Sequence, residues 1–368
     1  MFEKQPTLRI LARPGFHAAN PYTKLIYDGV TAAGARVDDY ALRRAAFGRY
    51  DIVHVHWPES TFNASLPEAL ATTRSLLLAI DALRARGTKL VWTAHNLRAH
   101  ERRFPRAESA FWRAFSARVD GVIALSQRAR APLAQRFPAL ASKSCFVIPH
   151  PHYRGIYPDG VTRSQARAAL GIAQDCKVLL FFGRILDYKN VPALIETVRR
   201  LRAREDGRKV VLLVAGKPHD AQLAERVRAA RGNDERVVLT LRHISDAETQ
   251  LFFRAADLVV LPYKDFFNSG AALLALSFDR PVLMPRREAA LELAEQVGHD
   301  WVHVYDELEP HTLELALLHA ARLPPVTNGR QLWLLDPNRI ARDTLAAYRV
   351  LANRVPSAAT DSHMAVLP

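Results

Sequence analysis

The chain has 368 residues, which is too long for one ordinary hydrophobic core, so two domains of roughly 150 residues each are expected. Its 2 cysteines, Cys145 and Cys176, have no CxxC partner and no histidine at metal-ligand spacing, which argues against a disulfide framework and a zinc site. No window reaches the roughly 18 apolar residues of a membrane-spanning helix, and residues 1–13 do not read as a secretion signal. A soluble, cytoplasmic protein is expected.

The positive charge is concentrated in the first part of the chain. Residues 1–150 carry 22 Lys and Arg against 11 Asp and Glu, so this part holds +11 of the total +14. Nucleic acid is a weak candidate partner, since no zinc-finger spacing, RRM-type run or basic zipper accompanies the charge. A membrane surface fits better, because residues 98–118 mix arginines such as Arg102 and Arg103 with aromatics such as Phe111 and Trp112. In the alternative interpretation, the aromatics lie in the core and the arginines in water.

In chain order, the first part alternates apolar strands with amphipathic helices. We predict strands at 8–12, 52–56, 90–93, 121–125 and 144–148, and helices at 22–33, 66–85, 98–118 and 127–137. The pair Asp38 and Asp39 is predicted to lie in a loop before a helix. Apolar strands separated by helices indicate a parallel sheet covered on both faces.

The second part repeats this alternation. Strands are predicted at 178–183, 209–215, 237–240, 258–261 and 282–284, and helices at 191–204, 221–230, 246–256 and 271–277. Prolines and glycines at 148–160 mark the join, which gives an N-terminal domain at 1–150 and a C-terminal domain at 151–335. A helix at 336–356 is expected to pack back towards the N-terminal domain, and 357–368 to be a disordered tail. The fold class is therefore α/β, with two Rossmann-like doubly wound domains facing a cleft.

One loop in the second part combines a glycine turn with two cations. The run FFGRILDYKNV at residues 181–191 leads from an apolar strand through Gly183 to Arg184 and Lys189. A guanidinium fork and an ammonium, approached closely by glycine backbone, suit a nucleoside diphosphate whose charge grows as it leaves. On this spacing alone, the alternative of two solvated surface charges stays open.

Four motifs in order resemble a known family. They are GRI…KNV at 183–191, VAGK at 214–217, AADLVVLPY at 255–263 followed by RPV at 280–282, and, more loosely, DIVHVHW at 51–57 with TAHN at 93–96. Together they resemble a GT-B glycosyltransferase of the family-four superfamily. The resemblance implies a nucleotide-sugar donor in the C-terminal domain and an acceptor in the N-terminal one.

The resemblance assigns donor contacts to individual positions. Arg184 and Lys189 would bind the diphosphate, Ile244 with His243 would meet the nucleobase, and His95 would contact the donor sugar. Tyr263 ends the matching strand motif. His95 and His243 each have an ordinary alternative, as a hydrogen-bonded core histidine and as a loop histidine.

The chain departs from the retaining members of this family at one place. Their two glutamates, eight positions apart, fall here on Phe266 and Leu274, so both carboxylates are missing. The segment NSGA instead opens a helix whose N–H groups and dipole suit a β-phosphate; its residues are Asn268, Ser269, Gly270 and Ala271. The alternative is a plain turn with an N-cap.

The altered pattern is similar to the inverting β-mannosyltransferases of xanthan-type polysaccharide assembly. This resemblance implies GDP-mannose as donor, a lipid-diphosphate-linked oligosaccharide as acceptor, and a position at the inner face of the plasma membrane. Acceptor contacts would come from the HVHWPE and NPY segments, through Asn20, Tyr22, His56 and Trp57. Trp57 suits stacking on a sugar face, although packing is the alternative.

An inverting displacement needs one general base, which should lie at a strand end of the acceptor domain. Glu59 fits best, and Glu101 and Asp265 are reserves; Pro58-Glu59-Ser60 could also be only a helix start. No metal and no cofactor are expected, because no Asp-x-Asp motif ends a strand. The alternatives are a retaining hexosyltransferase using a UDP-sugar donor, another nucleotide-sugar enzyme of the same fold such as an epimerase, and a catalytically silent nucleotide-binding protein.

Overall fold

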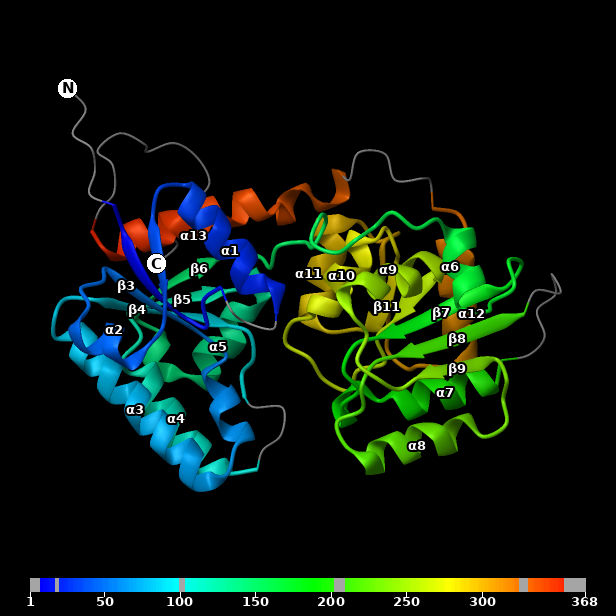
Figure 1. The fold of residues 1–368 in the computed structure, drawn as a ribbon, viewed down its shortest axis with the longest axis horizontal. Coiled ribbons are helices and arrows are strands. Elements are labelled where there is room, and N and C mark those ends of the chain that lie inside the picture. Colours follow the sequence, from blue (N-terminus) through cyan, green and yellow to red (C-terminus); the bar gives the residue numbers. More distant parts are fainter. Residues whose placement is uncertain (1–6, 17–19, 99–102, 202–208, 324–329, 354–368) are drawn as a thin grey trace. The chain divides into compact units, whose positions relative to one another are not determined.

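Two parallel sheets of six strands organise the chain (Figure 1). The computed structural model describes residues 7–16, 20–98, 103–201, 209–323 and 330–353. Its contacts divide the chain into unit 1, residues 1–151 with 335–368, and unit 2, residues 152–334. The boundaries predicted at 150 and 335 lie next to these. Two parallel sheets in an α/β architecture are the fold class that the sequence predicts, although each sheet has six strands where five were expected.

Unit 1 contains the sheet with strand order β2-β1-β3-β4-β5-β6, in which every neighbouring pair is parallel. Its strands are β1 (Arg9–Arg13), β2 (Arg36–Asp39), β3 (Ile52–His56), β4 (Lys89–Ala94), β5 (Gly121–Ala124) and β6 (Ser144–Val147). Its helices are α1 (Pro21–Ala32), α2 (Leu42–Phe47), α3 (Leu66–Arg84), α4 (Pro105–Ser116), α5 (Arg130–Arg136) and α13 (Pro337–Leu351), with 3₁₀ turns at Pro58–Asn63, Gln127–Ala129 and Pro138–Leu140.

Helix α13 returns from the end of the chain to pack on unit 1. It lies along α1, where Gly29 permits close approach: a Cβ at Gly29 would come within 2.5 Å of the Ala341 Cβ. Ile340, Leu345 and Tyr348 are buried in the same cluster as strand residues of β1 and β3. A single core therefore joins α1, α13 and the sheet.

Unit 2 contains the sheet with strand order β12-β11-β10-β7-β8-β9, also parallel throughout. Its strands are β7 (Lys177–Phe182), β8 (Val210–Ala215), β9 (Val237–Thr240), β10 (Leu258–Val260), β11 (Val282–Pro285) and β12 (Val302–Tyr305). Its helices are α6 (Arg163–Ala169), α7 (Val191–Arg199), α8 (Ala221–Arg231), α9 (Asp246–Ala255), α10 (Gly270–Ser277), α11 (Glu288–Val297) and α12 (Pro310–Ala320), with 3₁₀ turns at Asp187–Lys189 and Arg330–Leu335.

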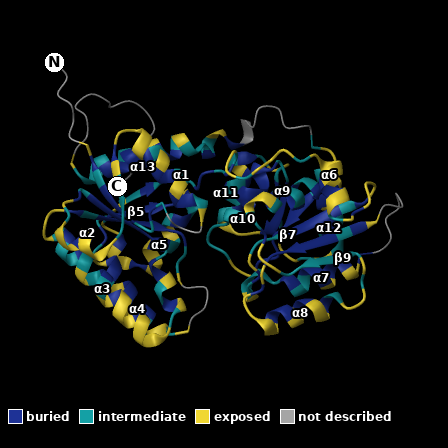
Figure 2. Cartoon of the chain, viewed as in Figure 1, coloured by how far each residue is buried: buried dark blue, intermediate teal, exposed yellow. Residues whose placement is uncertain are grey.

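The strands are buried and the helices are amphipathic, as expected for sheets covered on both faces. In Figure 2 the strands are mostly dark blue, while the outer faces of α3, α4 and α8 are yellow. Strand β3, with the sequence IVHVH, is buried throughout, which indicates an interior strand. Because the strands are buried and packed, the positions of their ends and of the loops that follow them are well defined.

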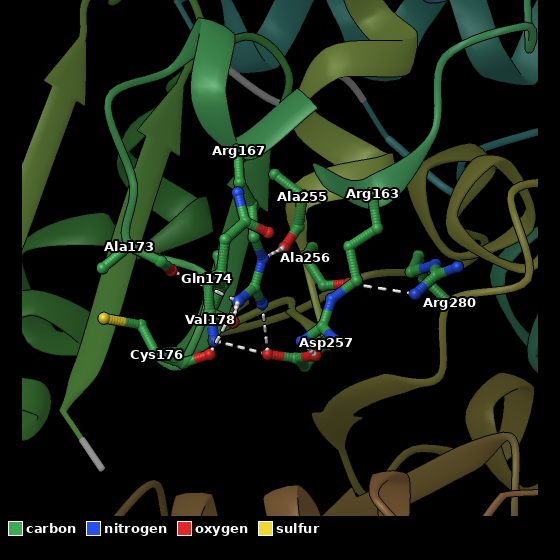
Figure 3. A network of polar contacts seen from close by, with 10 residues as sticks. All are labelled: Arg163, Arg167, Ala173, Gln174, Cys176, Val178, Ala255, Ala256, Asp257 and Arg280. Atoms are coloured by element: carbon green, nitrogen blue, oxygen red, sulfur yellow. Dashed lines mark hydrogen bonds and ion pairs between the residues drawn. The ribbon is translucent and has the colours of Figure 1, made fainter. Parts of the chain in front are cut away.

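A buried ion-pair network fastens α6 to the second sheet (Figure 3). The Arg167 side chain is fully buried and donates to Asp257 Oδ2 at 2.9 Å and to the carbonyls of Ala255, Gln174 and Cys176. Asp257 Oδ2 also accepts from the backbone N–H of Val178 at 2.7 Å. The guanidinium thus ties the start of β7 to the turn before β10.

The structure corrects four details of the predicted elements. Asp38 and Asp39 lie in the edge strand β2 and not in a loop. An edge strand can be largely polar, and Val37 is the one apolar residue that β2 offers to the core. The helix expected at 191–204 ends at Arg199, that expected at 98–118 spans Pro105–Ser116, and that expected at 336–356 spans Pro337–Leu351. The predicted tail, 357–368, lies outside the described residues.

Candidate active site

The loop after β7 in unit 2 brings the two predicted cations together. Gly183 has φ +116°, and a Cβ on Gly216, at the end of neighbouring β8, would come within 1.9 Å of the Gly183 carbonyl oxygen. Glycine at both strand ends is therefore needed for the close approach of the two loops. Arg184 is exposed, and its Nη2 lies 2.9 Å from Nδ1 of His219.

Lys189 lies half-buried on an aromatic floor in the same loop. Its Nζ is 5.5 Å from the ring centroid of Tyr263 and 6.0 Å from that of Phe181. Burial, helped by the charge of Arg184, lowers the pKa of Lys189 to about 8. Among the described residues neither cation forms an ion pair with a carboxylate, since the nearby Asp187 pairs with Arg226. An anion held between the cations would relieve their repulsion.

Helix α10 follows β10 in the sequence, and Asn268 lies just before its N-cap. The Ser269 hydroxyl caps the helix by accepting from Ala272 N at 3.3 Å, and the first backbone N–H groups of the helix are those of Gly270, Ala271 and Ala272. Phe266, at one missing-glutamate position, packs 6.0 Å from the Tyr263 ring. Apolar contact thus occupies the place where a carboxylate would stand.

Three further predicted residues of unit 2 differ in exposure. Ile244 is buried and His243 exposed in the loop between β9 and α9. Arg242 steadies that loop by donating to the His243 carbonyl and to Glu248, both at 3.0 Å. Asp265, a reserve base, is exposed in the loop before α10.

In unit 1, Trp57 directly follows β3 in a strained backbone conformation. Its φ of 43° and ψ of 49° lie in the left-handed region, which is unusual for a bulky residue and marks functional strain in many sites. The indole stacks on His95 with ring centroids 4.1 Å apart and an interplanar angle of 24°. Tyr22 meets the edge of His95 at 4.7 Å. These rings form one aromatic cluster at the carboxyl ends of β3 and β4.

Glu59 lies two residues beyond Trp57 and is buried. Asn96, which follows β4, donates from Nδ2 to Glu59 Oε1 at 2.8 Å. Burial raises the pKa of Glu59 to about 7, although the Asn96 hydrogen bond opposes the rise. A carboxyl that is half ionised near neutral pH is suited to accept a proton in catalysis.

The other predicted acceptor contacts have local structural roles. Asn20 caps α1 through its Oδ1, which accepts from Tyr22 N at 3.0 Å. His56 is 1% exposed, and its two ring nitrogens lie 2.7 Å from the Tyr27 hydroxyl and 3.0 Å from His95 Nε2. His56 thus lies beneath the cluster with both nitrogens engaged, and its contact with an acceptor stays a prediction.

The predicted membrane residues also need correction. Phe111 is 4% and Trp112 1% exposed, and Trp112 packs 5.1 Å from Trp92. They face the core of unit 1, so the prediction that these aromatics enter lipid is wrong. Arg103 is exposed and donates to the Asn63 carbonyl at 2.9 Å. Arg102 and the reserve base Glu101 lie outside the described residues.

Large apolar side chains are instead exposed on α2 and α3, which were not among the predicted membrane-contacting elements. The exposed fractions are 57% for Leu42, 85% for Phe47, 50% for Leu70 and 59% for Leu78. No described helix is long and apolar enough to cross a membrane. Across the same described ranges, no group of three or more His, Cys, Asp or Glu is arranged to hold a metal ion.

Sequence reasoning also missed Asn96 as the partner of Glu59. The sequence could have indicated this contact, because the residues that follow the carboxyl ends of adjacent parallel strands lie at the same edge of the sheet. In the register of β3 and β4, His56 pairs with Thr93. Loops starting at 57 and 95 must therefore be neighbours.

Comparison with known proteins identifies relatives of both units. Residues 30–151 match the family described as Glycosyltransferase Family 4, and residues 176–319 match Glycosyl transferases group 1. The chain is 33% identical over 307 residues to the GDP-mannose:glycolipid 4-beta-D-mannosyltransferase of Xanthomonas campestris pv. campestris, which covers 83% of this chain and 81% of that protein.

Other relatives are matched over less of the chain or only in fold. D-inositol 3-phosphate glycosyltransferase 2 of Catenulispora acidiphila is 34% identical over 128 residues, 33% of this chain and 30% of that protein. The structure of sucrose-phosphate synthase from Thermosynechococcus elongatus aligns with a TM-score of 0.62 at 15% identity, covering 95% of this chain and 97% of that one. That likeness shows the fold alone.

Proposed function

The chain belongs to the GT-B glycosyltransferases of the family-four superfamily, and we propose that it transfers mannose from GDP-mannose to a glycolipid with inversion at the anomeric carbon. The single observation that carries the donor and acceptor is the 33% identity to a GDP-mannose:glycolipid mannosyltransferase over 83% of this chain. The inositol 3-phosphate glycosyltransferases match over only about a third of it. Their substrates are therefore the weaker guide.

The loop after β7 would hold the leaving GDP. Arg184 and Lys189 offer two cations without carboxylate partners among the described residues, and the start of α10 offers backbone N–H groups with the positive end of the helix dipole. As the bond between the sugar C1 and the phosphate oxygen breaks, the electron pair leaves with GDP. Fixed positive groups stabilise that growing charge without having to reorganise.

Glu59 would act as the general base. In a single displacement, a hydroxyl oxygen of the acceptor forms the new bond to C1 while its proton passes to a Glu59 carboxylate oxygen, and the neutral acid later returns that proton to water. The Asn96 hydrogen bond fixes the Glu59 side chain and favours its ionised form. Trp57, half-buried and held in the left-handed region, would supply the sugar-stacking face.

Inversion is favoured by what replaces the glutamates of retaining members. Phe266 packs on Tyr263 and Leu274 is buried in α10, so neither position offers a carboxylate to the donor sugar. The second candidate is retaining transfer from a UDP-sugar, and the third is a nucleotide-binding protein without catalysis. Metal-independent chemistry, with cations supplied by side chains, is part of this proposal.

The acceptor's lipid would bring unit 1 to an anionic membrane through α2 and α3. Exposed Leu42 and Phe47 on α2 lie among Arg43, Arg44 and Arg49, and residues 40–50 contain no acidic side chain. Helix α3 packs beside α2 and exposes Leu70 and Leu78. Apolar side chains ringed by arginines match the interfacial region of a membrane with anionic lipids. A position at the inner face of the plasma membrane is part of this proposal.

A transfer assay tests the function. The protein is incubated with a short-chain polyprenyl-diphosphate oligosaccharide and either GDP-mannose or UDP-glucose, and free GDP or UDP is measured. Release of GDP with a β-linked mannosyl product, lost in Arg184→Ala, is the expected result. An α-linked product would establish retention, release of UDP alone would favour the second candidate, and binding of GDP without transfer the third.

A further inference from the structure

A chain of buried hydrogen bonds runs through unit 1 from helix α13 to the stacked His95. The Tyr348 hydroxyl lies 2.6 Å from Nδ1 of His54, and the Tyr27 hydroxyl lies 3.1 Å from the same nitrogen. Tyr27 also lies 2.7 Å from Nε2 of His56, whose Nδ1 is 3.0 Å from Nε2 of His95. All five side chains are buried.

The three rings are neutral in this interior. Burial lowers the pKa of His54 to about 3 and holds the pKa values of His56 and His95 well below the ordinary histidine value. A neutral imidazole has one N–H donor and one bare nitrogen acceptor. Each hydrogen bond between these rings therefore sets the proton position in the next one.

The direction of the chain is decided at His54. Its Nδ1 faces two tyrosine hydroxyls, each with a proton to donate, whereas its Nε2 lies 2.8 Å from the Thr93 hydroxyl. Two hydroxyls converging on Nδ1 favour it as the acceptor, which leaves Nε2–H to donate to Thr93. One lone pair cannot be fully shared by two donors, and Tyr348, 0.5 Å closer than Tyr27 on the distances of 2.6 and 3.1 Å, takes it.

The Tyr27 proton is then directed to His56. At 2.7 Å, His56 Nε2 is the better acceptor for Tyr27 than His54 Nδ1 at 3.1 Å. With Nε2 accepting, His56 carries its proton on Nδ1 and donates it to His95 Nε2. His95 then carries its own proton on Nδ1.

We infer that Tyr348 and Tyr27 are positioning residues, which act through His54 and His56 to hold His95 in the tautomer protonated on Nδ1. The inference rests on the proposed function and on the contact with the donor sugar that the family resemblance implies for His95: this tautomer carries an N–H donor on Nδ1 and not a base. Helix α13, nearly 300 residues away in sequence (294 between Tyr348 and His54), thereby determines the hydrogen-bonding character of a site residue.

Loss of the Tyr348 hydroxyl should reverse the chain. In Tyr348→Phe, His54 Nδ1 keeps only Tyr27 as donor, so Tyr27 turns to it and offers its oxygen to His56. His56 then donates from Nε2 and accepts from His95, which moves its proton to Nε2. In Tyr27→Phe/Tyr348→Phe no hydroxyl remains to accept from His56, so the original tautomer returns.

Nitrogen-15 NMR of histidine-labelled full-length protein reads the tautomer directly. His95 resonances are assigned by their loss in His95→Gln, and Tyr50→Phe, which removes a hydroxyl bonded to Asp38 elsewhere in unit 1, is the matched control. The expected result is exchange of the protonated and bare nitrogen signals of His95 in Tyr348→Phe, and their return in the double variant. No exchange in Tyr348→Phe, or wild-type His95 protonated on Nε2, would overturn the inference.

The transfer assay separates this inference from the proposed function. If wild-type protein releases no GDP while the tautomer pattern appears as expected, the positioning chain stands and the proposed function fails. If transfer occurs with the same KM and kcat in wild-type and Tyr348→Phe despite the tautomer exchange, the positioning role is overturned while the function stands.

Discussion

Asn96 donates a hydrogen bond of 2.8 Å to Oε1 of the buried Glu59, which joins the loops after β3 and β4. The two effects on the carboxyl oppose each other: burial raises its pKa, and the amide lowers it. Burial is the larger effect, so the pKa stands at about 7. The carboxyl is thus adjusted to the pH range in which a base must work.

Replacement of Glu59 by Gln should abolish transfer and leave donor binding intact. A general base contributes about 10²- to 10⁴-fold to a rate, and kcat should fall by that order. Asn63→Ala, in the same region of unit 1, is the control and should leave kcat unchanged. Asn96→Asp is unsuitable as a control because it adds a charge. An active Glu59→Gln protein with unchanged kcat would transfer the role to Glu101 or Asp265.

The pH–rate profile should report the same carboxyl. Glu59 must be ionised to act, so kcat/KM should rise with pH through the pKa of about 7. Asn96→Ala removes a hydrogen bond that lowers this pKa, and the rise should move to higher pH. A profile that is flat between pH 5 and about 9 in wild-type protein would exclude Glu59 as the base.

Arg184→Ala should weaken binding of free GDP. A hydrogen bond to a charged group contributes about 1.5–3 kcal/mol, which corresponds to at least roughly tenfold in Kd. Calorimetric titration measures it, with Arg228→Ala on α8 as the matched control, since Arg228 pairs with Glu225 away from the loop. Equal Kd values in Arg184→Ala and wild-type protein would remove the diphosphate from this loop.

Binding of GDP should also weaken above the pKa of Lys189. Burial lowers that pKa to about 8, and only the protonated ammonium attracts a diphosphate, so affinity should fall as pH rises through 8. Lys189→Arg, which stays charged, should remove this pH dependence. Calorimetric titrations with GDP between pH 7 and about 9.5 measure this loss of affinity. The same loss in Lys189→Arg would show that the pH dependence comes from another group.

The strands and the loop after β7 were predictable because their information is local. The five residues of β3 are apolar or buried without interruption, and the prediction for 52–56 has the bounds of the structure. Gly183, Arg184 and Lys189 share one loop by sequence alone. Strand β2, with the sequence RVDD, was missed because an edge strand needs little apolar burial.

Contacts between distant residues were not predictable from this chain. His54 and Tyr348 are 294 residues apart, and no period relates them. The membrane prediction for the aromatic residues of α4 was wrong for a different reason. Phe111, Trp112 and Phe115 are buried on one face of the helix, where Trp112 and Phe115 pack on Trp92. Their spacing in the sequence already fitted a helix face that packs on the core. Only the mixture of arginines and aromatic residues in this segment suggested contact with lipid.

Arg167→Ala should destabilise unit 2 strongly. It would remove the buried donor of the Ala255 and Cys176 carbonyls and one partner of Asp257, which keeps Arg163 and the Val178 N–H, and a loss of about 3–5 kcal/mol is expected. Arg163→Ala is the matched control, because Arg163 binds the same carboxylate from an exposed position and should cost less than about 1 kcal/mol. Urea unfolding measures both, and equal losses would contradict the importance of burial.

Vesicle binding should depend on the exposed apolar and basic side chains of α2. Phe47, 85% exposed, should enter the interface, so Phe47→Ser should weaken binding to vesicles of phosphatidylglycerol and phosphatidylcholine. Binding of wild-type protein should grow with the anionic fraction and fall with salt, because the arginines beside Phe47 are screened over about 10 Å at 0.1 M ionic strength. Leu318→Ser, at a residue 42% exposed in unit 2, should change nothing. Equal binding to neutral vesicles, or equal loss in Leu318→Ser, would refute α2 as the membrane-facing element.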